Sequence, residues 1–311
     1  MVRLDVNMLM EVFVINGLFK KANLNAAFSI SSEIIQIISS QNKNDKLDDF
    51  LSLDAIAHDE FLVNLLNKNI DKIISPQKET LLHVFIREFY EMYIYNEFYY
   101  YEDSIFDSGE FEGLYNLLEQ FGTVLKDFGL DTTDLEENIN RLIEKFDLEY
   151  EKESPNTKPL ENEVQQLIDD MRNTTLSLRD ELTENVFFLL FSNKKFLFDF
   201  NMMIAEYITP ENLPREIFDR FCHIKRCSYI PKWLENGIIY RDRATCQQCG
   251  ADLSNSYRIM ENGQLHFDHI IPLEKSGTND ATNFQLLCAN CNLTKNDTLQ
   301  LPNYQYQMYW K

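Results

Sequence analysis

Apolar residues recur every three to four positions through the first 220 residues, where glycine and proline are scarce. This spacing is the repeat of an amphipathic helix, so it predicts an all-helical region over residues 1–220. In the segment 178–208, Leu182, Val186, Leu189 and Leu190 fall on one helical face. Further apolar residues around that segment indicate deep burial.

Two stretches interrupt the helical pattern. Residues 148–163 combine charged residues, Ser, Asn and two prolines, which is typical of an exposed loop and predicts a possible break between two helical lobes. Near residue 210, Pro210 and Pro214 interrupt the pattern again, and Thr209 can cap the start of a helix.

The pattern changes after about residue 236, where glycines appear and short β-compatible runs replace the long helical periods. Residues 257–260, a Glu-Asn-Gly turn at 261–263 and residues 265–271 predict a β-hairpin, and residues 289–298 suit a short helix. The sequence therefore predicts a mainly α protein. A helical region, residues 1–220, is followed by a small ββα domain, residues 221–311, with its core at about 236–300.

Charge is unevenly distributed over these two regions. The net charge of −21 divides into −22 for residues 1–220 and +1 for residues 221–311. The acidic region as a whole would repel a phosphate backbone, so we expect any nucleic-acid contact mainly in the C-terminal part. No apolar run is long enough to span a bilayer and no secretory signal is recognisable, so we expect a cytoplasmic protein without a membrane partner.

Four of the six cysteines form two CxxC pairs, Cys246/Cys249 and Cys288/Cys291. Two such pairs can surround one Zn²⁺ tetrahedrally, and in a chain without an export signal this spacing favours a metal over disulfides. The alternative, four buried free thiols, does not explain the paired spacing. A small domain gains much of its folding free energy from such a zinc ion.

Asp268 and His269 are adjacent residues that the zinc site does not need. Both are costly to bury unpaired in a small core, so they indicate a catalytic or metal-binding role. Asp268 offers a hard oxygen suited to Mg²⁺ or Mn²⁺, whereas His269 points to the opposite side of an ideal strand. A bend before Pro272 would let both address one phosphate. Hydrolysis depends on this convergence, so a ring turned inward, far from the oxygen-bearing metal ligands and shut off from solvent, would overturn the prediction of hydrolysis.

The motifs CQQC, DHIIPLEKSG and LCANCN, with Asn283 between the last two, resemble the HNH, or ββα-metal, endonuclease family with a four-Cys zinc knuckle. The resemblance covers about residues 236–300. It implies that His269 is the general base, that Asp268 is a ligand of a catalytic metal, and that Asn283 tethers the loop and helps to orient the base. Asn292 stands where the family has its final His, which is similar to the HNN variant and implies a second ligand for Mg²⁺ or Mn²⁺.

Three basic residues are candidates for nucleic-acid contacts. Lys295, one turn after Asn292, could face the scissile phosphate, or it could be a solvated helix lysine. Arg241 and Arg243 precede the first Cys pair and could contact the DNA backbone, or they could be ordinary surface charges.

Some further residues have an ordinary structural interpretation. His266 shares strand parity with Asp268 and could touch the metal, although a partly exposed strand histidine is the simpler interpretation. Cys222, His223 and Cys227 could suggest a second metal site, but the four-residue gap and the lack of two more ligands nearby favour core thiols.

The leading hypothesis is a metal-dependent DNA endonuclease that acts in antiphage defence or restriction. Its acidic helical region would control assembly, either as a homo-oligomer or by docking on a partner such as an ATPase. Two alternatives stay open at this point: a zinc-knuckle binding or scaffold protein with a vestigial nuclease site, and an HNH nuclease that cleaves RNA.

Overall fold

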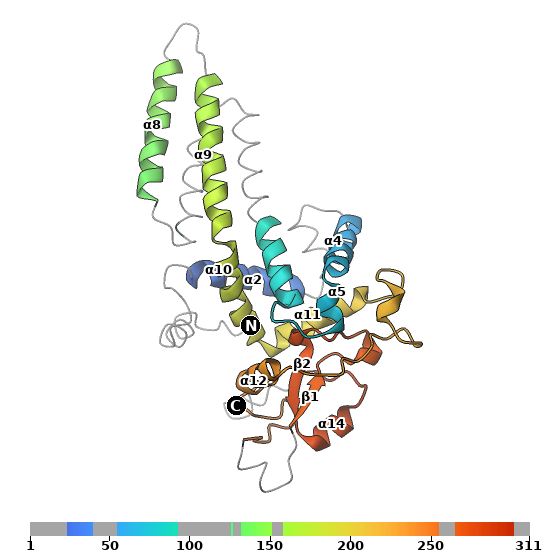
Figure 1. The fold of residues 1–311 in the computed structure, drawn as a ribbon. Coiled ribbons are helices and arrows are strands. Elements are labelled where there is room, and N and C mark those ends of the chain that lie inside the picture. Colours follow the sequence, from blue (N-terminus) through green and yellow to red (C-terminus); the bar gives the residue numbers. More distant parts are fainter. Residues whose placement is uncertain are drawn as a thin grey trace. The chain divides into compact units, whose positions relative to one another are not determined.

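The computed structural model describes residues 24–39, 55–92, 126, 132–150, 158–254 and 265–301 (Figure 1). These residues are mostly helical, with a two-stranded sheet near the C-terminus, which confirms the predicted fold class. The helices are α2 (Leu24–Ser39), α4 (Ala55–Lys68), α5 (Ile70–Ile74), α8 (Thr133–Tyr150), α9 (Lys158–Ser177), α10 (Arg179–Phe191), α11 (Lys194–Tyr207), α12 (Lys232–Arg241) and α14 (Ala289–Lys295). The strands are β1 (His266–His269) and β2 (Phe284–Leu287). None of the described helices could cross a membrane.

The chain forms two compact units that do not follow its linear order. Unit 1 contains Met1–Ser32 and Ile86–Val186, and unit 2 contains Glu33–Phe85 and Phe187–Lys311. Residues from both sides of position 220 therefore share unit 2. The assignment of separate tasks to residues 1–220 and 221–311 stays a prediction.

Unit 1 contains α8 and α9, which lie side by side (Figure 1). Leu160, Val164 and Ile168 recur every four residues on α9 and are buried. This is the spacing of one helical face. The interruption expected at residues 148–163 falls between these helices, although residues 151–157 lie outside the described part of the chain.

The segment 178–208 forms two helices rather than one. Leu182, Val186 and Leu190 are buried on α10, as expected from their spacing, whereas Leu189 is half-buried. The break follows because the side chain of Asn193 accepts a hydrogen bond from the backbone N–H of Phe196 at 3.1 Å, which caps a new helix. Helix α11 then runs through the core of unit 2.

The sheet of unit 2 pairs β1 with β2 in antiparallel register, and α14 follows directly. The ββα order agrees with the sequence prediction, and β1 lies within the expected strand 265–271. The expected strand 257–260 and turn 261–263 lie outside the described residues, and the observed partner of β1 is β2, which the sequence analysis missed. Side chains from α12, β2 and the Cys pairs form the local core: Leu234, Ile238, Cys246, Leu253, Ala281, Phe284, Leu286, Leu287 and Cys288.

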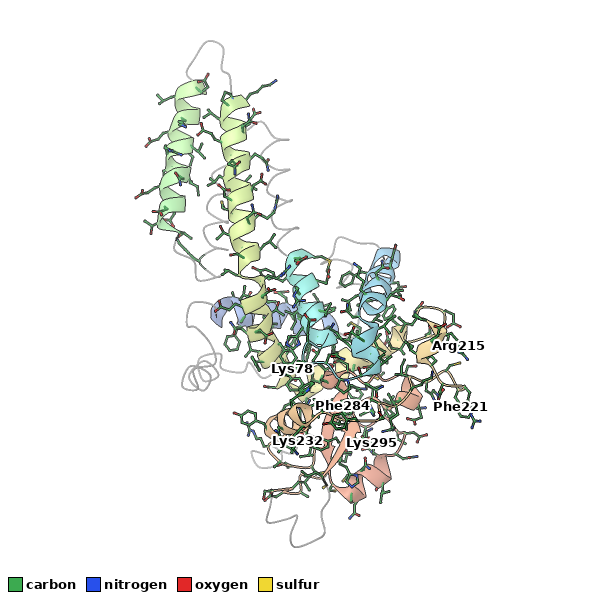
Figure 2. The ribbon with its side chains drawn as sticks, in the orientation of Figure 1. Lys78, Arg215, Phe221, Lys232, Phe284 and Lys295 are labelled. Carbon is green, nitrogen blue, oxygen red and sulfur yellow. The ribbon has the colours of Figure 1, made fainter. Side chains whose placement is uncertain are left out.

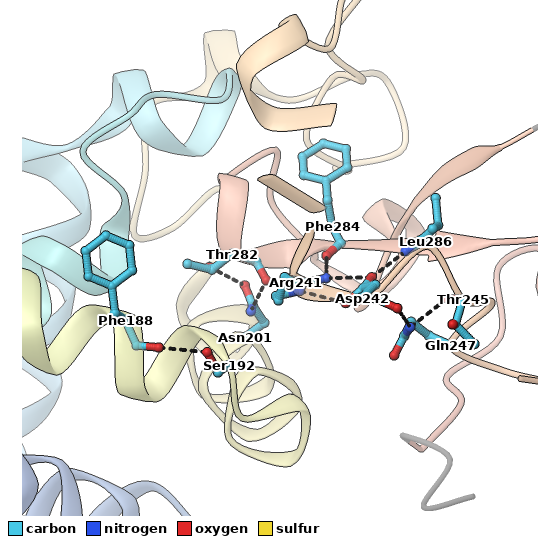
Figure 3. Close-up of polar contacts among 10 residues, drawn as sticks. All are labelled: Phe188, Ser192, Asn201, Arg241, Asp242, Thr245, Gln247, Thr282, Phe284 and Leu286. Atoms are coloured by element: carbon cyan, nitrogen blue, oxygen red, sulfur yellow. Dashed lines mark hydrogen bonds and ion pairs between the residues drawn. The ribbon is translucent and has the colours of Figure 1, made fainter. Parts of the chain in front are cut away.

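The loop between β1 and β2 is fastened to helical segments elsewhere in unit 2. The backbone N–H of Leu81 donates to Asp280 Oδ2 at 2.8 Å, and the side chain of Asn201 on α11 donates to the carbonyl of Thr282 at 3.3 Å (Figure 3). Burial raises the pKa of Asp280, while its hydrogen bonds from Thr282 and Leu81 act in the opposite direction. The loop is therefore built into the helical core.

Candidate functional site

The four cysteines of the two CxxC pairs converge on one point. Their Sγ atoms all lie within 4.8 Å of one another, and the Cys249 and Cys288 Sγ atoms are 3.8 Å apart. Four sulfurs placed tetrahedrally at the usual Zn–S distance of about 2.3 Å would be about 3.8 Å apart. The geometry thus fits a structural zinc ion.

The four thiols are close enough to influence one another's ionisation. Burial raises the pKa of Cys291, and hydrogen bonds with the neighbouring thiols Cys288 and Cys249 raise it further. Four thiols this close cannot ionise together unless a cation compensates their charge. A divalent ion that accepts thiolate ligands supplies that compensation.

His269 lies at the end of β1, and its side chain points into the protein. The residue is only 2% exposed, and its ring centroid lies 4.6 Å from that of Phe284. The ring is therefore turned inward and shut off from solvent, contrary to the expectation that it addresses the same phosphate as Asp268. The cause is strand parity, because neighbouring residues of a strand face opposite sides and the chain bends only after His269.

The hydrogen bonds around Asn279 determine which nitrogen of His269 carries the proton. The Nδ2 group of Asn279 donates to the carbonyls of Ile74 at 3.1 Å and Lys225 at 2.8 Å, which fixes the orientation of the amide. Its Oδ1 therefore faces His269 Nε2, at 3.2 Å. Since this oxygen can only accept, Nε2 must donate, and the lone pair resides on Nδ1.

The Nδ1 atom of His269 has no hydrogen-bond partner among the described residues and is buried. Burial lowers the pKa of His269 to about 3, and the positive charge of Arg226 is the next contribution to that shift. The imidazole is thus neutral at physiological pH and presents one unpaired acceptor. Asn279 and Arg226 were missed by the sequence analysis, since nothing in their local sequence indicates contact with His269.

Asp268 points to the other side of β1 and forms an ion pair with Lys295. The Lys295 Nζ lies 2.8 Å from Asp268 Oδ2 and also donates to the His269 carbonyl at 2.8 Å. Lys295 is only 1% exposed (labelled in Figure 2), so the alternative of a solvated helix lysine is wrong. Gln285 Nε2 makes a long contact, 3.5 Å, with the same oxygen. Among the described residues these contacts use Oδ2, which leaves Asp268 Oδ1 for another ligand.

Asn292 lies on α14 beside β1. Its Nδ2 atom is 3.3 Å from Nδ1 of His266, which is half-buried on the strand. If the amide group donates to this ring, Asn292 Oδ1 remains an acceptor. Asp268 and Asn292 can thus each contribute one oxygen, the ligand type that Mg²⁺ and Mn²⁺ prefer.

Asn283 ties together the two ends of the loop between the strands. Its Oδ1 accepts from the Ile271 N–H at 2.8 Å, and its Nδ2 donates to the carbonyls of Ile271 at 3.0 Å and Thr278 at 2.9 Å. This is the geometry of a tether. Its influence on the orientation of His269 stays a prediction.

The two candidate arginines differ in exposure. The side chain of Arg241 is only 5% exposed. It bonds to both carboxylate oxygens of Asp242, at 2.8 and 3.0 Å, and to the Phe284 carbonyl at 2.6 Å (Figure 3). Arg241 is thus engaged within the protein, whereas Arg243 is exposed. Contact of either with nucleic acid stays a prediction.

Comparison with known proteins adds one match. A family model described as HNH endonuclease matches residues 246–298, a range that contains the four cysteines as well as Asp268, His269, Asn283 and Asn292. Comparison with the curated proteins and with the solved structures gives no match. The match and the converging thiols together identify the C-terminal region of this chain as an HNH endonuclease domain with a four-Cys zinc-knuckle site.

Proposed function

We propose that this protein is a metal-dependent endonuclease that hydrolyses phosphodiester bonds in DNA. The observation that carries the proposal is the state of His269 within the HNH domain: a neutral imidazole whose Nε2 is held by Asn279 and whose Nδ1 is unpaired. An HNH domain implies nucleic acid as the substrate. The choice of DNA over RNA is part of the proposal.

His269 would act as the general base through Nδ1, which accepts a proton from the attacking water. Asn279 keeps the proton on Nε2 and stabilises the imidazolium that forms, because its Oδ1 can accept only from a protonated nitrogen. Asn283 would hold the loop in place during this transfer. Asp268 and Asn292 would hold Mg²⁺ or Mn²⁺ through their side-chain oxygens. The metal, when bound, supplies neutralisation of the scissile phosphate and of the leaving oxygen.

The buried ring places a condition on this proposal. Water must reach Nδ1, and His269 and Asp268, which face opposite sides of β1, must come to address one phosphate. The end of the strand around His269 therefore has to rearrange when substrate binds. Lys295 holds two of the groups concerned, the Asp268 carboxylate and the His269 carbonyl. Release of Lys295 would free the carboxylate and leave its ammonium group available to a phosphate.

The same burial favours a second candidate function. A zinc-stabilised binding or scaffold protein with a vestigial site would tolerate a histidine closed off from solvent and an aspartate neutralised by lysine. The two functions differ in one measurable property, which is turnover of nucleic acid.

The test is cleavage of supercoiled plasmid by the full-length chain with Mg²⁺ or Mn²⁺. We expect nicking by the wild type and its loss in His269→Ala, while Asn290→Ala, on the exposed side of α14, cleaves normally. Zinc content and melting temperature show whether each variant is folded. If wild type and His269→Ala leave the plasmid equally intact with both metals, or if only RNA is cut, the proposal is wrong.

We further propose a role as a cytoplasmic effector of antiphage defence or restriction, with the acidic helical residues mediating self-association or docking of a partner such as an ATPase. The net charge of −22 over residues 1–220 supports the assignment of a task other than DNA binding to that region. Plaque counts on cells expressing wild type or His269→Ala test the role. Light scattering of the purified chain tests self-association.

A further inference from the structure

Residues 218–224 form a tight hairpin just before the HNH domain. An isolated antiparallel bridge joins its two ends. The side chain of Asp219 accepts hydrogen bonds from the backbone N–H groups of Phe221 at 2.7 Å and His223 at 3.0 Å. Cys222 takes a left-handed conformation, with φ of 65°. The turn is therefore fixed by backbone groups and by Asp219, without help from the side chain at its tip.

The tip of the hairpin presents Phe221 to solvent. Its side chain is 62% exposed, and the guanidinium carbon of Arg220 lies 4.6 Å from its ring centroid. Figure 2 shows Arg215 on the same side of unit 2. Cys222 is also exposed, so its interpretation as a core thiol is wrong, and its Sγ lies 3.0 Å from Arg215 Nη1. The hairpin thus holds an aromatic ring in solvent, in a fixed place, that the turn itself does not need.

The hairpin and the residues around it are basic in an acidic chain. Residues 215–226 contain four Lys or Arg and two acidic residues, against a net charge of −21 for the whole protein. The four basic residues are all exposed: Arg215, Arg220, Lys225 and Arg226. Their combination with an aromatic ring complements a polyanion that also offers flat apolar faces, which describes nucleic acid.

Residues 225–227, at the root of the hairpin, are hydrogen-bonded to Asn279, the residue that holds His269. The Lys225 carbonyl accepts from Asn279 Nδ2 at 2.8 Å, and the Cys227 N–H donates to Asn279 Oδ1 at 3.3 Å. The hairpin therefore adjoins, through residues 225–227, the side chain that holds His269, and nucleic acid bound at His269 would lie near it.

We propose that the hairpin 218–224 contacts duplex DNA beside the cleavage site, inserting Phe221 between neighbouring bases while Arg220 and Arg226 bind the flanking phosphates. This inference rests on the proposed function, because it assumes DNA at the HNH site. Insertion would unstack one base step, and the same movement could be passed to Asn279 through the two backbone bonds at the hairpin root.

The test uses the full-length, zinc-bound protein and short DNA duplexes that contain the fluorescent base 2-aminopurine. Mg²⁺ and Mn²⁺ are left out so that the strands stay intact. We expect 2-aminopurine fluorescence to rise on binding to the wild type. Phe221→Ala should abolish the rise and weaken binding about tenfold, since stacking on one base is worth roughly that factor or more. Phe221→Trp should retain both properties. Tyr240→Ala, which removes an aromatic ring that is 84% exposed on α12, is the matched control.

The basic residues are tested by the salt dependence of the same binding. Arg220→Ala and Arg226→Ala should each lower the slope of log K against log salt by about one. The inference is overturned if the wild type gives no fluorescence rise, if Phe221→Ala behaves as Tyr240→Ala does, or if only RNA is bound. Plasmid cleavage without unstacking would refute the hairpin and leave the nuclease intact. Unstacking without cleavage under any metal would refute the proposed nuclease and leave the proposed hairpin contact intact.

Discussion

Replacing Asn279 by alanine would remove the most highly connected side chain near His269. Asn279 is 0% exposed, and its side chain makes four hydrogen bonds, at 3.2, 3.3, 3.1 and 2.8 Å, to three separate segments of unit 2. Each such bond is worth about 1 kcal/mol net, and the partners left behind stay buried. The free energy of unfolding of unit 2 should thus fall by about 4 kcal/mol, which corresponds to about 10 °C in melting temperature.

Calorimetry and urea titration of the full-length chain measure this loss. Asn236→Ala, at an exposed position of α12, is the control and should melt with the wild type. A melting temperature of Asn279→Ala within about 2 °C of the wild type would refute the hydrogen-bond network, because even two of the four bonds are worth more than that.

Nitrogen-15 spectra of histidine-labelled protein examine the tautomer independently of stability. Wild-type His269 should carry its proton on Nε2, and subtraction of the His269→Ala spectrum assigns the signal among the five histidines. A proton found on Nδ1 instead would remove the acceptor on which the proposed general-base role depends.

Three other changes have defined consequences. Cys246→Ser should release the zinc and unfold the HNH domain, measured as metal content and as loss of cooperative melting; full zinc retention would contradict the four-Cys site. Gly277→Ala should prevent normal folding, because the added Cβ would lie 2.0 Å from the Ile271 carbonyl oxygen; a soluble variant with wild-type melting would show that the loop adapts. Lys295→Met should cost about 3 kcal/mol in urea unfolding, since it leaves the Asp268 carboxylate unpaired, and an unchanged urea midpoint would argue against the pair.

Local patterns in the sequence were sufficient for the mainly helical character of the described residues and for the zinc site. The burial of Leu160, Val164 and Ile168 follows from a four-residue spacing that is visible within one segment. The two CxxC pairs likewise carry their geometry in their own spacing, since each pair contributes one edge of a tetrahedron. The strand β2 was missed because four residues without an adjacent turn signal do not establish an alternating pattern.

The environment of the catalytic candidate could not be predicted, because it depends on long-range contacts. Asn279 is bonded to carbonyls 205 and 54 residues away along the chain. The burial of Lys295 likewise depends on Asp268, which lies on a different element, and an isolated helix motif is equally compatible with a solvated lysine. Local sequence identified which residues could perform chemistry, whereas tertiary structure decides which of their atoms are available.

The loop between β1 and β2 has a consequence for proteolysis in the cell. A C-terminal fragment cut away near residue 220 would keep every motif residue of the HNH domain, but it would lose the backbone groups of Ile73, Ile74 and Leu81 that fasten Asn279 and Asp280. We expect such a fragment to lack the proposed nuclease activity. That activity would require the two halves of unit 2 to be present together, whether in one polypeptide or in two that reassemble.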